Sequence, residues 1–189
     1  MDITQQFDAY EITNGKFRKK TNGTLDESVD LGCTGTLSVE PDTQTIVKRC
    51  EGRTTKEVIR FNKLDCTFNG HMPVGVLRDV YGLTDKDLAT GVYGYGTKSI
   101  NASGNLTFDV YDLTRENNKK IAFPNISWIS GLSFTLENGL DEVATVEVNF
   151  SAFVDEAGYA YYETFEDTIT GWNDNFDTQL VTTEEPEGE

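Results

Sequence analysis

The single histidine, His71, limits the nucleophilic chemistry that this sequence could support, because a Cys-His or Ser-His-Asp system would have to use it. It lies in the segment 69–73, between a predicted strand and a predicted helix, and no G-x-S-x-G signature accompanies it. We therefore expect a structural or surface position for His71. The glycines of 91–96 lack the Lys-Ser/Thr of a phosphate loop, and carboxylates are too abundant for any pair to indicate a glycosidase. No catalytic residue is predicted, and we expect a protein that is not an enzyme.

Metal and cofactor sites have little support. Cys33, Cys50 and Cys66 are widely spaced with no C-x-x-C pair, which is typical of free thiols in a reduced cytoplasm rather than of zinc or disulfides. The segment 173–177 has the Asn and Asp residues of a calcium loop. The central Gly and distal Glu of an EF-hand are missing at their required offsets, so calcium near Asp174 stays an alternative. We predict no metal and no cofactor.

Charge is distributed unevenly along the 189 residues, which carry 16 basic and 32 acidic side chains and a net charge of −16. Residues 1–70 hold 10 basic and 11 acidic groups, whereas residues 71–189 hold 6 and 21, and no Lys or Arg follows Lys120. Nucleic-acid binding depends on cations that displace the counterions of phosphates. The last third of the chain should therefore repel DNA and RNA.

Alternation of apolar and polar residues predicts a chain of short strands. The predicted strands are 31–39, 44–50, 58–68, 106–110, 132–136, 144–154 and 159–165. Pro41 and Asp42 predict a turn between the first two, and a change of phase between Phe61 and Leu64 predicts a bulge in the third. Residues 155–158 predict a turn that closes a hairpin into the last strand.

One helix is predicted over 73–82. Pro73 suits its first turn, Val74, Leu77 and Tyr81 follow at i, i+3 and i+7, and Gly82 suits the position after its end. Eight to ten strands with one flanking helix predict an all-β fold of the β-sandwich or barrel type.

Three regions are predicted: an N-terminal arm with the first strand (1–30), a β-sandwich domain (31–167), and a C-terminal arm with an acidic tail (168–189). A chain of this length buries enough surface to fold without disulfides or a metal. The first residues contain neither a basic segment nor an apolar run, so we expect neither secretion nor membrane spanning.

Several segments of the sequence resemble one protein family. They are GHMPVGVLRDVYGL (70–83) and LATGVYGYG (88–96), continued by 121–124, 130–132, 137–139, 141–144 and 161–167, and preceded by 35–41 and 50–52. Together they resemble the tail tube (major tail) proteins of long-tailed phages (siphophages) that infect Gram-positive bacteria. The resemblance implies a virion structural protein made in the host cytoplasm. Its subunits would assemble into rings, usually hexameric, that stack into a hollow tube whose inner barrel is continuous between subunits. The implied partners are further copies of the chain, the tape measure protein and other tail proteins, and DNA that passes without specific binding.

Such a channel should lack free cations, because each would bind phosphate and retard the DNA. The polar faces of the clearest predicted strands carry neutral or acidic side chains, as this requires. We expect the following residues to face the lumen: Thr107, Asp109, Ser133, Thr135, Glu137, Thr145, Glu147, Asn149 and Ser151.

Basic residues cluster at 16–20 and around 48–56, where they could contact the acidic part of an adjacent subunit. We expect 42–56 to be an inter-ring loop, with these contact residues: Pro41, Asp42, Lys48, Arg49, Arg53 and Lys56. Ordinary solvated surface charge is the alternative for these residues. The alternative function is a carbohydrate-binding or adhesive virion module, in which tyrosines stack on sugars. The candidate tyrosines are Tyr93, Tyr95, Tyr159, Tyr161 and Tyr162.

Overall fold

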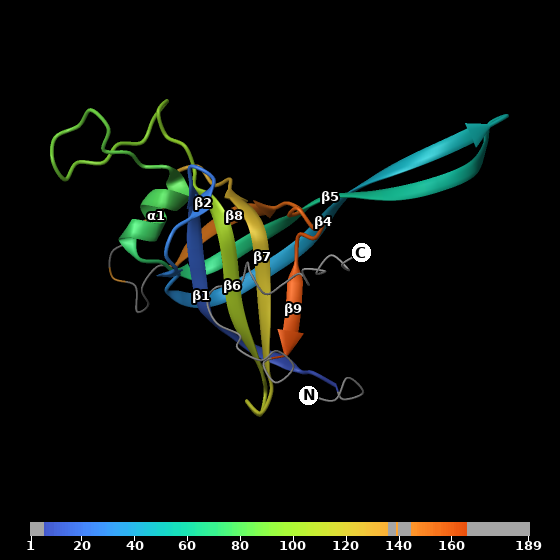
Figure 1. Ribbon diagram of the computed structural model, residues 1–189, viewed down its shortest axis with the longest axis horizontal. Coiled ribbons are helices and arrows are strands. Elements are labelled where there is room, and N and C mark those ends of the chain that lie inside the picture. Colours follow the sequence, from blue (N-terminus) through green and yellow to red (C-terminus); the bar gives the residue numbers. More distant parts are fainter. Residues whose placement is uncertain (1–5, 136–138, 140–144, 166–189) are drawn as a thin grey trace, which may run out of the picture.

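The computed structural model describes residues 6–135, 139 and 145–165, which form a nine-stranded antiparallel sheet and one helix (Figure 1). The elements in chain order are β1 (Ala9–Thr21), β2 (Thr24–Leu25), β3 (Val29–Asp30), β4 (Cys33–Cys50), β5 (Arg53–His71), α1 (Val74–Tyr81), β6 (Ser103–Asp112), β7 (Asn118–Trp128), β8 (Val146–Ala152) and β9 (Tyr162–Phe165). The order across the sheet is β2-β1-β6-β7-β8-β5-β4, with β3 paired to β1 and β9 to β7. The predicted all-β fold is confirmed.

The sheet crosses over itself around one core. In Figure 1, β1, β6 and β7 lie side by side and β4 and β5 cross them, while β8 pairs with β7 on one edge and β5 on the other. Aromatic rings from the two halves meet in the middle. Phe68 of β5 lies 6.2 Å from Phe108 of β6 between ring centroids, and Trp128 lies 5.3 Å from Phe150, its partner in the β7–β8 ladder. The two inner faces thus bury each other as the sheets of a sandwich do.

Helix α1 packs Val76, Val80 and Tyr81 against this core. It begins after Pro73 and ends at Gly82, whose φ of 66° is left-handed and whose N–H is directed at the carbonyl oxygens of Arg78 and Asp79. A glycine is favoured there because it has no Cβ to oppose a positive φ. The helix predicted over 73–82 is therefore confirmed.

The β4–β5 ribbon corrects one prediction and confirms another. The turn predicted at Pro41 and Asp42 is wrong, because β4 runs through both residues without a break. β4 lies at the edge of the sheet, where a proline can be accommodated without loss of a ladder hydrogen bond. Opposite this point the pairing steps from Asp42–Lys63 to Thr43–Phe61, which leaves Asn62 as an extra residue. The predicted bulge between Phe61 and Leu64 is confirmed.

Two other strand predictions differ from the structure. Residues 131–135 form no strand, and Leu132 and Phe134 are exposed. β8 pairs with β5 along its length, and on its other edge β7 pairs with 150–152 while Ile129 and Ser130 bond Asn149. The turn at 155–158 is present, with the Gly158 N–H donating to the Asp155 carbonyl at 3.1 Å. The following strand β9 pairs with β7 instead of β8, so the predicted hairpin between these two strands is wrong.

The described residues have one core, and it includes Phe17 of β1, which is fully buried. The predicted boundary between an N-terminal arm and a β-sandwich domain, at residues 30 and 31, stays a prediction. The region 168–189, with the possible calcium loop at 173–177, lies outside the described residues.

We expect Gly82→Ala to lower the free energy of unfolding by about 1–2 kcal/mol, because an L side chain is disfavoured in the left-handed region. The new Cβ would also lie 2.5 Å from the carbonyl carbon of Ile100. Gly75→Ala, inside the same helix, is the matched control. Its Cβ would meet nothing within 4 Å, so it should raise stability by about 0.5–1 kcal/mol. Urea unfolding followed by circular dichroism measures both, and similar effects of the two substitutions would contradict this account of the helix end.

Candidate functional site

The outer side of β4, β5 and β8 carries a continuous surface of polar side chains, which we call the polar face. Its residues alternate with inward-facing Leu37, Phe68 and Phe150, and the cross-strand register aligns them in rows. The rows are Thr36, Asn69 and Glu147; Ser38, Thr67 and Asn149; Glu40, Asp65 and Ser151; and Asp42 with Lys63. Four of these side chains are carboxylates and one is a cation, so the face is acidic.

Hydrogen bonds tie the polar face to its surroundings. The Thr67 hydroxyl donates to the Asn149 side-chain oxygen at 2.8 Å, across β5 and β8. Ser130 Oγ accepts the Asn149 backbone N–H at 2.6 Å, and the Ile129 N–H donates to the Asn149 carbonyl at 3.0 Å. The segment 129–130 therefore fixes the free part of the β8 edge and holds the polar side chains in a defined arrangement.

At one end of the face, Lys63, Asp65 and Ser151 form a hydrogen-bonded cluster. Lys63 Nζ lies 2.8 Å from Asp65 Oδ1 and 3.1 Å from Ser151 Oγ. The hydrogen bond with Asp65 raises the pKa of Lys63, and the same bond lowers the pKa of Asp65 against the effect of desolvation. The lysine is held protonated, so it is unsuited to act as a general base toward Ser151. The cluster is an ion pair, not a Ser-Lys catalytic pair.

The structure brings together some of the residues predicted to face a lumen. Glu147 and Asn149 lie exposed on the polar face, Thr145 is exposed just before β8, and Ser151 lies on the face but is 1% exposed. Ser133 and Thr135 are exposed on the segment without a strand, and Glu137 lies outside the described residues.

Thr107 and Asp109 belong to β6, in the other half of the sheet. Asp109 is 7% exposed, so the expectation of a solvent-facing carboxylate is wrong for the subunit as described. Lys120 on the neighbouring β7 lies 2.6 Å from its Oδ1, and the Asn14 amide donates to its Oδ2 at 2.8 Å. Cross-strand pairing thus supplies a cation that the pattern of a single strand does not reveal.

Residues of β4 and β5 complete the polar face but were not predicted to belong to it. They are Thr36, Ser38, Glu40, Lys63, Asp65, Thr67 and Asn69, together with Asp42, which was assigned to the inter-ring contact. Their alternation with Leu37, Val39, Cys66 and Phe68 is visible in the sequence. The pairing of β5 with β8, which makes one surface of them, is not.

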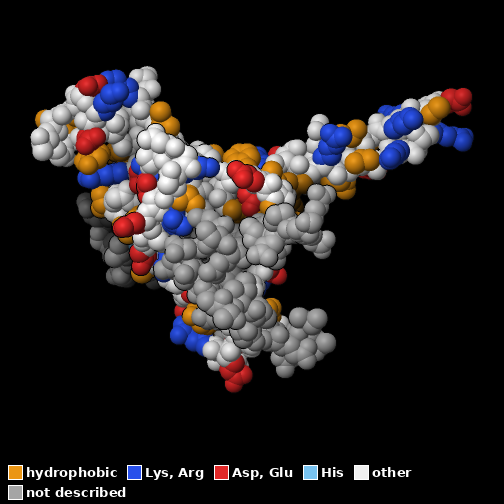
Figure 2. Space-filling view, in the orientation of Figure 1, with side chains coloured by type: hydrophobic (Ala, Val, Ile, Leu, Met, Phe, Trp, Pro, Cys, Tyr) orange, Lys and Arg blue, Asp and Glu red, His pale blue; other side chains and the backbone are white. Residues whose placement is uncertain are grey.

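Beyond the bulge, β4 and β5 project from the body as a two-stranded hairpin (Figure 1), which we call the hairpin and which spans residues 43–61. The predicted inter-ring loop is therefore largely paired strand. Lys48, Arg49, Arg53 and Lys56 lie toward its tip, and Pro41 and Asp42 lie at its base. Figure 2 shows blue basic side chains alternating with orange apolar ones along it.

Large apolar residues stand exposed on both faces of the hairpin. The register places Thr45 with Ile59 on one face and Ile46 with Val58 on the other, and Ile59 is 67% exposed. Lys48 and Lys56 lie directly opposite each other, an arrangement that is destabilising unless an anion lies nearby. Within the described ranges, neither lysine forms an ion pair. Apolar and cationic side chains without partners indicate a surface for another polypeptide.

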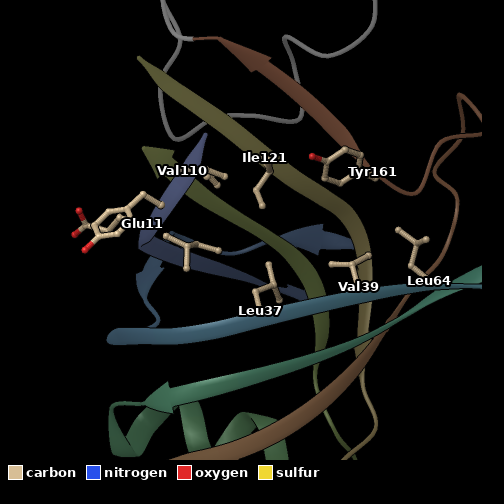
Figure 3. Close-up of a pocket in the computed structure, with 10 residues that line it drawn as sticks. Glu11, Leu37, Val39, Leu64, Val110, Ile121 and Tyr161 are labelled. Atoms are coloured by element: carbon tan, nitrogen blue, oxygen red, sulfur yellow. The ribbon is translucent and has the colours of Figure 1, made fainter. Parts of the chain in front are cut away.

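An apolar hollow of about 470 Å³ opens where β1, β6 and β7 face β4 and β5 (Figure 3). Ile12, Leu37, Val39, Leu64, Val110 and Ile121 are among its lining residues. Two of its polar side chains are bonded, because Arg115 Nε donates to Glu11 at 2.9 Å and the Tyr161 hydroxyl donates to Glu163 at 2.6 Å. The hollow offers apolar contact and no nucleophile.

The histidine, cysteines and tyrosines that the sequence singled out do not form a common site. His71 is exposed at the end of β5, Cys33 and Cys50 are exposed, and burial raises the pKa of the Cys66 thiol to about 12. Tyr93 lies beneath the Arg78 guanidinium at 3.7 Å in the loop after α1. Tyr159 precedes β9 and Tyr162 is its first residue, and their rings are 5.7 Å apart. The tyrosines considered for sugar stacking thus come from separate parts of the fold.

Among the described residues, no three His, Cys, Asp or Glu side chains are grouped so that they could hold a metal ion. The helix that the structure describes there, α1, is too short to cross a bilayer.

No family model matches this sequence, and no curated protein matches it. Among solved structures, one that is similar is the anti-feeding prophage cap, a tube-terminating cap, which is 11% identical to this chain. The match covers 87% of this chain and 95% of that one, with a TM-score of 0.45. The sequence identity and the TM-score are too low for this similarity to indicate a function.

We expect Lys120→Met to lower the free energy of unfolding by about 3 kcal/mol, because it leaves the buried Asp109 carboxylate without its cation. Lys98→Met is the control, since Lys98 lies 2.7 Å from Asp87 in a pair whose side chains are 64% and 66% exposed. It should change stability by less than about 1 kcal/mol. Guanidinium unfolding at constant pH measures both, and a small effect of Lys120→Met would show that Asp109 is effectively solvated.

Proposed function

We propose that this chain is a tail tube protein of a long-tailed phage, whose copies assemble into rings, hexameric as is usual in that class, that stack into a hollow tube. DNA would pass through this tube into the host cell. The observation that carries the proposal is the acidic polar face of β4, β5 and β8. The carboxylates of such a wall repel a passing polyanion. The residues of the polar face also offer it no unpaired cation that could replace its counterions.

The lumen in this proposal is lined by the polar face, so Glu147, Asn149 and Thr145 remain candidates, joined by Glu40 and Asp65. Ring symmetry would repeat each carboxylate around the channel. Charges at the wall act over a Debye length of about 8 Å at physiological salt, which is enough to influence DNA close to the wall.

The hairpin supports the second part of the proposal, which is assembly. Residues Gln44–Arg60 carry five basic and two acidic side chains, although the whole chain has a net charge of −16. A basic projection on an acidic body favours a contact between unlike surfaces of two copies. Contacts of this heterologous kind propagate when they do not close on themselves. We infer that the hairpin reaches an acidic surface of an adjacent subunit.

The proposed activity involves assembly and passage of DNA, with no catalytic step, no cofactor and no metal. The partners would be other copies of the chain, a tape measure protein and other tail proteins, and the proposed location is the virion. A sugar-binding module is not proposed, since the candidate tyrosines of the described chain do not form one platform.

Reversal of charge on the polar face tests the channel. The variant Glu40→Lys/Glu147→Lys should still form tubes but slow DNA ejection from assembled particles, roughly tenfold at low salt and less at high salt. Glu116→Lys/Glu156→Lys is the matched control, because it makes the same charge change at exposed turns outside the polar face. Equal ejection rates for the two variants would refute the assignment of the face to the lumen.

Reversal of charge on the hairpin tests assembly. Lys48→Glu/Lys56→Glu keeps two like charges opposite each other within the chain, so the fold of the subunit should change little. We expect soluble subunits or single rings in negative-stain electron microscopy, where the unaltered chain forms rods. Lys86→Glu, at an exposed lysine in the loop after α1, should leave the rods intact. Normal rods from the hairpin variant would contradict the contact.

A further inference from the structure

Lys63 is the one cation among the residues that make up the polar face, and it lies beside the bulge where the acidic body meets the basic hairpin. A lysine on a lumen wall is unexpected, because its flexible four-carbon stem could carry the ammonium toward passing phosphates. The other charged side chains of the face, Glu40, Asp42, Asp65 and Glu147, are all carboxylates.

The surroundings of Lys63 restrict this ammonium. Its Nζ lies 2.8 Å from Asp65 Oδ1 and donates to Ser151 Oγ at 3.1 Å, and the Ser151 hydroxyl donates in turn to Asp65 Oδ1 at 3.1 Å. The three groups form a closed triangle. Ser151 is 1% exposed and is fixed in the β5–β8 ladder directly opposite Asp65, so one corner of the triangle cannot move freely.

The contribution of this pair to folding is small, because its side chains are 30% and 49% exposed and water screens them. The pair has a larger effect on the charge that the polar face presents to solvent. With Asp65 in place the pair is neutral, and the ammonium is bonded to Asp65 and Ser151. Asp42 lies opposite Lys63 in the β4–β5 ladder and acts on it only at longer range, so without Asp65 the ammonium would lose the ion pair that the described residues give it.

We propose that Asp65 and Ser151 hold Lys63 against β5 and β8, so that a polyanion crossing the polar face meets no free ammonium. Asp65 is therefore a positioning residue: it would affect DNA only by holding the Lys63 ammonium in place. The consequence for DNA rests on the proposed function, whereas the restraint of the ammonium does not.

The test uses the full-length chain and two measurements. Asp65→Asn removes the carboxylate that pairs with Lys63, and Glu147→Gln is the matched control, because it removes one carboxylate from the same face while the triangle stays intact. Lys63→Gln/Asp65→Asn removes the released cation as well. The first measurement is nitrogen-15 NMR of the Lys63 ammonium, with each chain carrying Lys48→Glu/Lys56→Glu as well, because that change is expected to keep the subunits soluble. We expect slowed hydrogen exchange in the chain without further changes and in Glu147→Gln, and fast exchange in Asp65→Asn.

The second measurement is the release of a duplex DNA oligonucleotide from assembled tubes as salt is varied. Asp65→Asn should release it severalfold more slowly and with a steeper salt dependence, and the double variant should return to the rate of Glu147→Gln. Equal release from Asp65→Asn and Glu147→Gln, or slow release that persists in the double variant, would overturn the role toward DNA. If no tubes form, the proposed function fails. The NMR measurement then still decides the restraint, which unchanged exchange in Asp65→Asn would disprove.

Discussion

The double pairing of β8 is the constraint on which the rest of this structure depends. β8 is hydrogen-bonded to β7 on one edge and to β5 on the other, so it joins the two halves of the sheet that enclose the core. Val148 and Phe150 point inward and are fully buried, while Glu147 and Asn149 alternate with them on the outside. One short strand thereby closes the core and contributes to the polar face. Its second edge is bonded by β7 at 150–152 and by residues 129–130 at Asn149, while 131–135 forms no strand and β9 pairs with β7.

Unpaired strand edges are consistent with the proposed assembly of this chain. In the described residues, the outer edge of β4 is free, and β5 loses its second partner beyond Leu64, so the hairpin has two open edges and apolar side chains on both faces. Soluble monomers normally protect such edges with charge, bulges or covering elements. Here the charges are cations on a strongly acidic molecule, an arrangement that would resist nonspecific pairing and would favour the proposed contact with an acidic surface of a second copy.

Electrostatics divides the β4–β5 ribbon into two parts with opposite properties. On the body side of the bulge the outer face is acidic, and on the hairpin side basic residues dominate, with Lys63 and Asp42 at the border. In the proposed tube, a surface that must not retain DNA and a surface that must hold a neighbour require opposite signs of charge. The ribbon has both on one pair of strands, and at the border the charge of Lys63 is balanced by Asp65 while Asp42 adds a negative charge.

The sequence by itself determined the local features of this protein. The helix over 73–82 follows from Pro73, the spacing of its apolar residues and Gly82, and the bulge near Asn62 follows from a change of phase, because both depend on neighbours along the chain. Which strands pair was decided by the tertiary structure, since pairing joins residues such as Asp65 and Ser151 that are far apart in sequence. For the same reason the sequence identified Glu147 and Asn149 but not Thr67 beside them, and it did not show that Lys120 neutralises Asp109. Alternation tells which side chains share a side of one strand, whereas a surface is made only when several strands meet.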